Sequence, residues 1–359
     1  MTTLPDAQYL LPPSAYWDPD WYEREMRELF AETWNLVAYR TDLGTPGDHL
    51  PVTVGNEPIL LVHQDDGSIA AFVNMCRHRG MVMFCEAGRA DRLRCMYHGW
   101  EYENTGTLVR IPQRRSQFPD VDTAEWGLIP VACGEWDGMV FVNPSGDAEP
   151  FEDWLGDYPA HCGPFQLDRL VEVRRHQVDI ACNWKLYIEN HIDVLHLWYL
   201  HEDSLGMYDH RNFAHAGVGP HWVSSERLRP GATRERTSMS EHMRPISHLP
   251  AEERDVLRAN LLFPNVPMSS SETLYMTYQV VPTGPTTSRL DIRVRAEPGS
   301  VLDDDGLAEL CTVLVSEDAT AVERIQDVIQ SQRFEVGPLA VDHERPITEF
   351  HEAILRRLR

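Results

Sequence analysis

The pattern of apolar and polar residues predicts that the chain begins with a helix. Asp18-Pro19-Asp20 offers an N-cap, a proline at the first helical position and early negative charge. Apolar residues then recur at helical spacing, at Tyr22, Met26, Leu29 and Phe30. We therefore expect a helix of about four turns in the N-terminal segment, residues 1–35.

From Asn35 the pattern changes to short runs of β-forming residues separated by turns. Ile59–Val62 and Ile69–Val73 flank Asp65-Asp66-Gly67, which predicts a β-hairpin. Shorter strands are expected at Glu101-Tyr102, Leu108-Val109 and Met139–Val142. Residues 36–145 are thus predicted to form an all-β domain.

A polar stretch rich in chain breakers, Pro144–Pro150, predicts a domain boundary. The second domain, residues 146–359, mixes helical and strand periodicity, which indicates the α+β class. Its helices are expected at 183–200 and 317–331, and its strands at 257–267, 272–282 and 288–296. Residues 226–256 are rich in charge, Pro, Ser and Met without clear periodicity, which predicts a mobile surface loop or lid.

Length and composition narrow the function classes. At 359 residues the chain is long enough for two domains of about 150 residues each. A net charge of -24 repels nucleic acid and anionic lipid surfaces. No stretch approaches the roughly 20 apolar residues of a membrane span, and Met1–Pro5 lacks the features of a signal peptide, so we expect a cytoplasmic protein.

The seven cysteines, an odd number without regular spacing, disfavour a disulfide framework. Two of them have suggestive neighbours, in Cys76-Arg77-His78 and Cys95-Met96-Tyr97-His98. Thiolate and imidazole suit either Zn(II) or an iron–sulfur cluster. Each segment supplies one Cys and one His, which favours a cluster with two unlike irons, a Rieske [2Fe-2S] centre, and leaves zinc as the alternative.

The surroundings of these pairs, Asn74–Gly80 and Cys95–Trp100, resemble the two cluster loops of the Rieske ring-hydroxylating oxygenase family. The resemblance implies that the cluster ligands are Cys76, His78, Cys95 and His98. Respiratory-chain Rieske proteins carry a further cysteine in each loop, and the two form a disulfide; Met81 and Tyr97 stand at those places here. Met96 stands where the family commonly has proline and removes no ligand.

A second group of possible metal ligands lies in the predicted helix 183–200 and just beyond it. Steps of four and three place Glu189, Asp193 and His196 on one face of such a helix, flanked by apolar residues. Buried charges need partners or a metal, although a polar stripe at a domain interface gives the same pattern. His201 lies five residues beyond His196, about 140° round an ideal helix, so both reach one ion only if the helix ends or distorts between them.

A site with two histidines and one carboxylate needs an acidic residue from elsewhere. In the predicted helix 317–331, Asp318 heads an apolar stripe. Glu317 lines up instead with Arg324, where an arginine can satisfy it near solvent. Helical phase therefore favours Asp318 over Glu317 as the ligand.

This region resembles the catalytic domain of the same family, in which an acidic-x3-Asp-x2-His-x4-His motif is followed by a distant Asp on a C-terminal helix. The resemblance implies an antiparallel sheet covered by helices, of the helix-grip type, against which residues 1–35 pack. It also implies that a mononuclear Fe(II) is bound by His196, His201 and Asp318.

The resemblance gives further residues a role in transfer between the two metals. Asp193 is expected to bridge from the iron histidines to His98 of an adjacent subunit, which makes a homotrimer the functional unit. Glu189 is expected to support the site without binding the metal, whereas His191 lies off the stripe.

The expected function is that of an oxygenase subunit that activates O2 at Fe(II) with electrons relayed through the cluster. Its substrate would be a small, aromatic or ring-containing molecule, which is hydroxylated, cis-dihydroxylated or oxidatively demethylated. Because the sequence has no Gly-rich nucleotide-binding loop, a separate reductase, with or without a ferredoxin, would supply electrons from NAD(P)H. The alternatives are a Rieske electron carrier without catalysis and a zinc-stabilised binding module.

Overall fold

The computed structural model describes residues 7–232 and 242–358. The chain divides into two compact units, one formed by Met1–Arg24 with Leu155–Arg359 and the other by Glu25–Trp154. These boundaries differ from the predicted breaks after residues 35 and 145, because residues 25–35 and 146–154 group with the β-rich unit. The predicted N-terminal helix is present as α1 (Pro19–Glu25), followed by a π-helical turn over Met26–Phe30.

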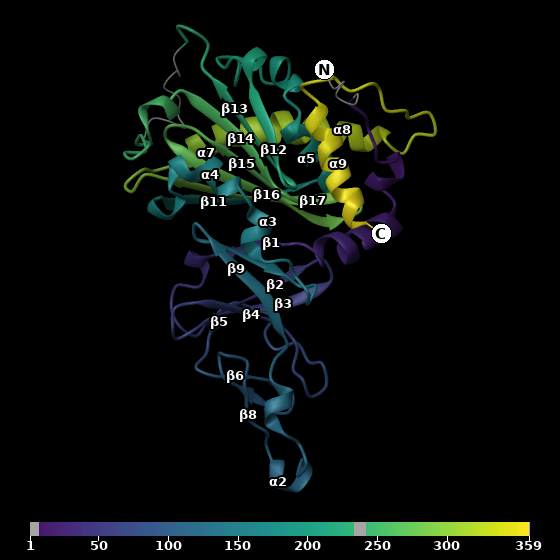
Figure 1. The fold of residues 1–359 in the computed structure, drawn as a ribbon, viewed down its shortest axis with the longest axis vertical. Helices are drawn as coiled ribbons and strands as arrows, with labels where there is room; N and C mark the ends of the chain where they lie inside the picture. Colours follow the sequence, from purple (N-terminus) through teal and green to yellow (C-terminus); the bar gives the residue numbers. More distant parts are fainter. Residues whose placement is uncertain (1–6, 233–241, 359) are drawn as a thin grey trace. The chain divides into compact units, whose positions relative to one another are not determined.

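The unit Glu25–Trp154 is built from two antiparallel sheets (Figure 1), as the all-β prediction requires. The larger sheet has the order β1-β10-β9-β4-β3-β2-β5 and the smaller one β6-β7-β8. The strands are β1 (Asn35–Tyr39), β2 (Asp48–Val54), β3 (Glu57–His63), β4 (Ile69–Val73), β5 (Gly88–Arg89), β6 (Leu93–Arg94), β7 (Glu101–Tyr102), β8 (Leu108–Arg110), β9 (Pro130–Trp136) and β10 (Met139–Asn143). A short helix, α2 (Arg114–Gln117), follows β8.

The predicted hairpin is confirmed as β3 paired with β4, in register from Ile59 opposite Val73 to His63 opposite Ile69. Leu60 and Val62 of β3 are buried in the same apolar core as Cys76 and Cys95. This core holds the sulfur atoms of the two cysteine segments inside the unit and leaves the histidines nearer its surface.

The other unit contains a seven-stranded antiparallel sheet with the order β11-β17-β16-β15-β14-β13-β12. Its strands are β11 (Val171–Ile180), β12 (Ala214–Val218), β13 (His221–Arg227), β14 (Val256–Leu262), β15 (Val266–Ser270), β16 (Leu274–Gly284) and β17 (Thr287–Ala296). The helices are α3 (Phe151–Leu155), which spans the unit boundary, α4 (Tyr158–Cys162), α5 (Trp184–Ile192), α7 (Asp304–Cys311), α8 (Thr320–Val328) and α9 (Arg345–Arg357). This arrangement confirms the α+β class.

Several predicted elements need correction. The strand expected at 257–267 is two strands, β14 and the start of β15, joined by a turn. The edge strand β11 was missed because four consecutive polar residues, Arg174–Gln177, interrupt its alternation of apolar and polar positions. In the predicted loop 226–256, residues 226 and 227 end β13, Ala251–Glu253 form a 3-10 turn, and residues 233–241 lie outside the described part of the chain.

Helix α5 connects the sheet of this unit to two of its other helices. It packs on β14 and β16 and contacts α8 and α9 (Figure 1). Two side chains of α8 secure its start, since Glu323 accepts the N–H of Ala181 at 2.8 Å and Gln326 accepts that of Asn183 at 2.8 Å. Among the described residues, no helix combines the length and the apolar character needed to cross a bilayer.

Candidate metal centres

The two segments that carry Cys76 and Cys95 form loops with the same hydrogen-bond pattern. In each loop the cysteine N–H donates to the carbonyl five residues on, and the glycine four residues on donates to the cysteine carbonyl. These distances are 2.7 and 3.0 Å in the first loop and 2.9 and 3.0 Å in the second. Gly80 and Gly99 have φ of 72° and 68°, the left-handed region that favours glycine. The backbone therefore presents both Cys and His pairs in closely similar ways.

The four side chains converge with sulfur inside and nitrogen outside. Cys76 and Cys95 are each 1% exposed, whereas the His98 ring is exposed. The Nδ1 atoms of His78 and His98 lie 3.2 Å apart. Burial raises the pKa of the Cys76 thiol, and the neighbouring Cys95 adds to this, so thiolates there require bound cations. Two buried sulfurs and two facing imidazoles fit the donor set of a Rieske [2Fe-2S] cluster.

Tyr102 is a neighbour of this centre that the sequence analysis did not single out. Its hydroxyl lies 3.5 Å from Cys76 Sγ and accepts the Arg77 N–H at 3.1 Å. Burial raises the pKa of Tyr102, so the phenol keeps its proton and can donate it to a cysteine thiolate. Trp100 stacks on the His78 ring at a centroid distance of 5.0 Å.

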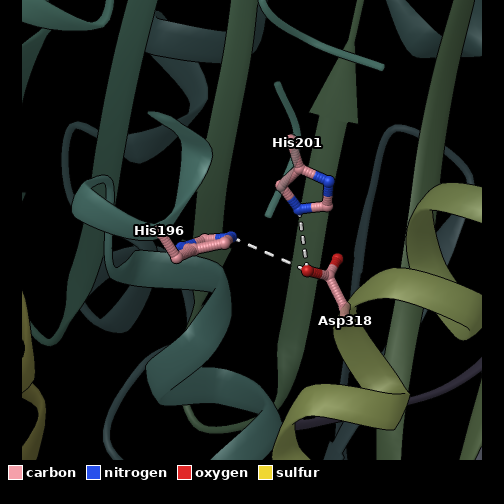
Figure 2. A group of neighbouring side chains, drawn as sticks. All are labelled: His196, His201 and Asp318. Atoms are coloured by element: carbon pink, nitrogen blue, oxygen red, sulfur yellow. Dashed lines mark hydrogen bonds and ion pairs between the residues drawn. The ribbon is translucent and has the colours of Figure 1, made fainter. Parts of the chain in front are cut away.

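The second centre brings together His196, His201 and Asp318, as expected (Figure 2). Their ligand atoms all lie within 4.8 Å of one another. Asp318 Oδ1 lies 2.8 Å from His201 Nε2 and 3.6 Å from His196 Nε2. Two imidazoles and one carboxylate converging on one point fit a mononuclear iron that keeps coordination positions open.

The end of α5 makes this convergence possible. The helix was expected to continue to residue 200, with a possible break between the two histidines, but it already ends at Ile192. Asp193 is the C-cap, with extended backbone at φ -78° and ψ 121°, and His196 lies in the 3-10 turn that follows. Glu189, Asp193 and His196 therefore do not form a stripe on one helix, and the break lets His201 turn back toward Asp318.

Asp318 comes from a π-helix, Thr312–Ala319, that precedes α8. The Asn190 amide of α5 donates to its Oδ1 at 2.8 Å. Burial alone would raise the pKa of Asp318, but the interactions with His196 and His201 outweigh it and hold the pKa well below its usual range. For His196, burial lowers the pKa, and the carboxylates of Asp193 and Asp318 more than offset this and raise it to about 9. The site thus favours positive charge between its carboxylates.

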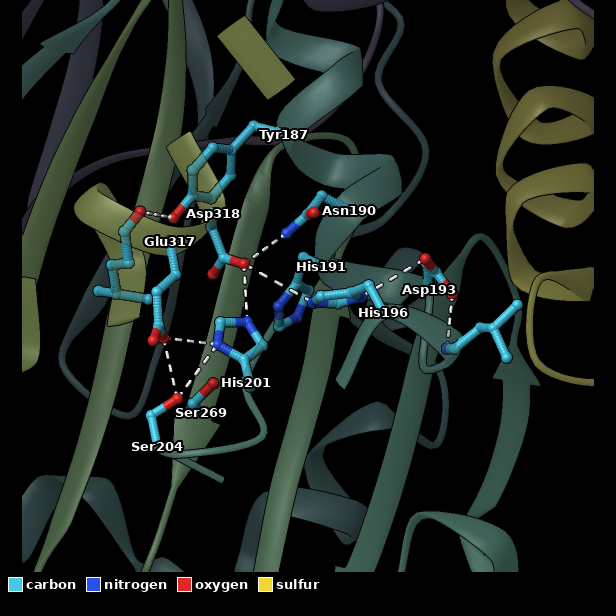
Figure 3. A network of polar contacts seen from close by, with 12 residues as sticks. Tyr187, Asn190, His191, Asp193, His196, His201, Ser204, Ser269, Glu317 and Asp318 are labelled. Atoms are coloured by element: carbon cyan, nitrogen blue, oxygen red, sulfur yellow. Dashed lines mark hydrogen bonds and ion pairs between the residues drawn. The ribbon is translucent and has the colours of Figure 1, made fainter. Parts of the chain in front are cut away.

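Each histidine points Nε2 toward Asp318 and Nδ1 toward another carboxylate (Figure 3). His196 Nδ1 lies 3.4 Å from Asp193 Oδ2, and His201 Nδ1 lies 2.8 Å from Glu317 Oε2. The interpretation that an arginine satisfies Glu317 near solvent was therefore wrong about its partner.

Glu189 takes part in a different cluster. Its carboxylate accepts hydrogen bonds from Tyr9 and Tyr16 at 2.9 and 2.5 Å, and it lies 2.9 Å from Nε2 of His351 on α9. Within the described residues, these contacts join α5 to the N-terminal segment and to α9, and none of them reaches the candidate metal ligands His196, His201 and Asp318. Because α5 ends three residues after Glu189, His196 and His201 do not continue the helical face on which Glu189 lies.

His191, which the helical pattern set apart, lies beside the candidate ligand His196 (Figure 3) and takes part in a chain of polar contacts. Burial lowers its pKa to about 4, so the ring is neutral. Its Nε2 lies 2.9 Å from the Asn260 carbonyl and must donate, which leaves Nδ1 to accept from Tyr278 at 2.6 Å. Ser269 bonds the Tyr278 hydroxyl at 2.9 Å. The packing of α5 on β14 and β16 brings these residues together.

Comparison with known families agrees with both centres. The family described as "Ring hydroxylating alpha subunit (catalytic domain)" matches residues 167–359, more than half of the chain. This chain belongs to that family. The family described as "Rieske [2Fe-2S] domain" matches residues 33–127, which include both cysteine loops.

Two relatives illustrate how much of the chain is matched and how similar its sequence is to theirs. The chain is 35% identical over 187 residues to the chlorobenzene dioxygenase subunit alpha of Cupriavidus sp. (strain PS12), covering 49% of this chain and 40% of that protein. It therefore spans about two fifths of the length of that subunit. It is 27% identical over 382 residues to the glycine betaine monooxygenase oxygenase subunit of Chromohalobacter salexigens, covering 96% of this chain and 84% of that protein.

Solved structures share the fold over nearly the whole chain. A quaternary ammonium Rieske monooxygenase superimposes with a TM-score of 0.82 at 20% identity, covering 99% of this chain and 97% of the other. Naphthalene 1,2-dioxygenase from Rhodococcus sp. superimposes with a TM-score of 0.78 at 20% identity, covering 97% and 94%. The fold prediction, a Rieske domain followed by a catalytic domain with an antiparallel sheet and helices, is confirmed.

Proposed function

We propose that this chain is the oxygenase subunit of a Rieske non-haem iron oxygenase, which hydroxylates, cis-dihydroxylates or oxidatively demethylates a small organic molecule. The observation that carries the proposal is the convergence of His196, His201 and Asp318 in a domain of the ring-hydroxylating family. A Rieske electron carrier without catalysis, the alternative, has no use for a second buried donor set.

In this proposal each donor set holds its own metal. Cys76 and Cys95 would hold one iron of the cluster, and His78 and His98 would hold the other. The mononuclear iron is held by His196, His201 and Asp318. An iron held there would supply open coordination positions for O2 and one of the electrons for its reduction, and the cluster would supply another. Asn190 holds the Asp318 carboxylate by the 2.8 Å hydrogen bond described above.

We also propose that the two metals cooperate across a subunit boundary in a homotrimer, with Asp193 bridging from His196 to His98 of a neighbouring copy. The exposed His98 ring supports this, as does the 16% exposure of the Asp193 side chain. Residues 77–115 contain eight arginines and four acidic residues, although the chain as a whole carries -24. This basic surface around the cluster fits an acidic partner such as a second copy of the chain.

Electrons are proposed to come from NAD(P)H through a separate reductase, with or without a ferredoxin. An NAD(P)H-linked donor and seven free cysteines fit the cytoplasmic location expected from the sequence. For the substrate, relatives act on aromatic hydrocarbons in some cases and on quaternary ammonium compounds in others, so both classes belong in the test.

The test is oxygen uptake by the purified protein with a surrogate reductase and a substrate panel. The panel contains an aromatic hydrocarbon, an aromatic carboxylate and a quaternary ammonium compound. The product mass separates gain of one oxygen, gain of two oxygens with two hydrogens, and loss of a methylene. Asp318→Ala should lose mononuclear iron and product formation while it keeps the cluster spectrum. A fully loaded protein that accepts electrons but converts no substrate would favour the carrier, and a colourless zinc protein would favour the binding module.

A further inference from the structure

We propose that Glu317 is a positioning residue for the catalytic metal, which acts by fixing the orientation and tautomer of His201. This inference rests on the proposed iron site formed by His196, His201 and Asp318. It gives Glu317 a role other than that of metal ligand or of a surface carboxylate paired near solvent.

The contacts of Glu317 define what it does to His201. Glu317 Oε2 lies 2.8 Å from His201 Nδ1 and accepts the hydroxyl hydrogen of Ser204 at 2.9 Å (Figure 3). Carboxylates lie 2.8 Å from both ring nitrogens, and a carboxylate can only accept, so when Nε2 gives its lone pair to a metal the ring proton is on Nδ1, where Glu317 accepts it. The lone pair of Nε2 then points to the position shared with Asp318. Hydrogen bonding of this kind also makes an imidazole a more basic metal ligand.

Burial makes this arrangement hard to replace with solvent. The His201 side chain is 2% exposed, whereas that of Glu317 is 22% exposed. Water therefore has little access to the ring, and Glu317 supplies the acceptor that the Nδ1 hydrogen needs.

The other histidine is supported differently. His196 Nδ1 lies 3.4 Å from Asp193 Oδ2 and makes no hydrogen bond of acceptable geometry in the described residues. The Asp193 carboxylate also accepts the Leu195 N–H at 2.6 Å. His201 is thus the more firmly held of the two histidines, through Glu317 Oε2 at 2.8 Å and, at the longer distance of 3.3 Å, through Ser204 Oγ.

Two consecutive residues of the π-helix, Glu317 and Asp318, contact the same histidine, His201. In an α-helix, neighbouring side chains diverge by about 100°. The segment Thr312–Ala319 is instead a π-helix, and from it Asp318 Oδ1 and Glu317 Oε2 each lie 2.8 Å from a ring nitrogen of His201. The Tyr187 hydroxyl donates to the Leu314 carbonyl at 2.9 Å and ties this segment to α5.

The test uses Co(II) as the probe, titrated into protein whose mononuclear site has been emptied by a chelator while the cluster is retained. Glu317→Ala should weaken Co(II) binding about 10–100-fold, the usual effect of removing such a partner, and shift the Co(II) absorption bands. Glu317→Gln keeps an acceptor oxygen without the charge and should restore part of the affinity. Ser204→Ala, which leaves the carboxylate in place, should have a smaller effect. Because the cluster lies in the other unit, far-UV circular dichroism and denaturant unfolding are used to show that each variant is folded.

Asp318→Ala separates failure of this inference from failure of the proposed site. If Asp318→Ala loses Co(II) while Glu317→Ala and Glu317→Gln bind it as tightly and with the same absorption as the unmodified protein, the positioning role of Glu317 is overturned and the iron site stands. If Asp318→Ala also binds Co(II) normally, the proposed iron site itself is overturned, and the inference with it.

Discussion

The two proposed metal centres differ in how the chain assembles them. The cluster ligands lie between residues 76 and 98, in two loops with matching backbone hydrogen bonds. The iron ligands lie between residues 196 and 318, on a broken helix end and a π-helix, and each histidine faces an additional carboxylate. A centre that exchanges electrons with a partner protein needs ligands near the surface, which His98 provides. A centre that reduces O2 benefits from burial and from charges that are already in place.

The largest expected effect is the loss of one centre without the other. Cys95→Ser should abolish the visible colour, the acid-labile sulfide and all reductase-driven turnover, because it removes a cluster thiolate. It should leave Co(II) binding at the mononuclear site intact. Visible absorption, sulfide analysis and a Co(II) titration check this. Simultaneous loss of both metals would contradict the independence of the two centres.

A smaller effect is expected from uncoupling the centres. Asp193→Asn should keep both metals but slow cluster oxidation in a single turnover by about 10–100-fold, because the bridging carboxylate is lost. Stopped-flow absorption of the cluster measures this rate. Asp203→Asn, a change at an exposed neighbouring carboxylate, is the matched control. An unchanged rate in Asp193→Asn would remove its bridging role.

The contact between the Tyr102 hydroxyl and Cys76 Sγ can be tested through the reduction potential of the cluster. Tyr102→Phe removes the hydroxyl 3.5 Å from Cys76 Sγ. This hydrogen bond stabilises the reduced cluster, which is the more negative state, by about 1 kcal/mol. Its loss should therefore lower the reduction potential of the cluster by about 40 mV. Spectroelectrochemical titration checks the shift. Tyr97→Phe, at an exposed tyrosine in the second loop, should leave the potential unchanged.

The smallest functional effect is expected at Glu189, since its contacts run to Tyr9, Tyr16 and His351. Glu189→Gln should lower the free energy of unfolding by about 1–3 kcal/mol, because one amide oxygen cannot serve three donors, two of which are buried. Denaturant unfolding measures this loss. Glu352→Gln, in an exposed ion pair with Arg356, should cost less than about 1 kcal/mol. Loss of mononuclear iron in Glu189→Gln would return Glu189 to the catalytic site.

Much of the cluster region was predictable because its interactions are local. The hairpin of β3 and β4 and both cysteine loops depend on residues within a few positions of one another. In the catalytic domain, the strands β16 and β17 and the choice of Asp318 over Glu317 as the residue facing both histidines also followed from periodicity.

The ends of helices and the contacts between residues distant in sequence could be found only in the tertiary structure. A uniform helical period assumes an unbroken α-helix, so it missed the end of α5 at Ile192. It also missed the π-helix Thr312–Ala319, from which Glu317 contacts His201. The partners of Glu189 come from the N-terminal segment and α9, far away in the sequence. The sequence by itself determined the donor types and the fold class, because these depend on composition and local spacing. Packing between distant elements determined which carboxylate supports which histidine.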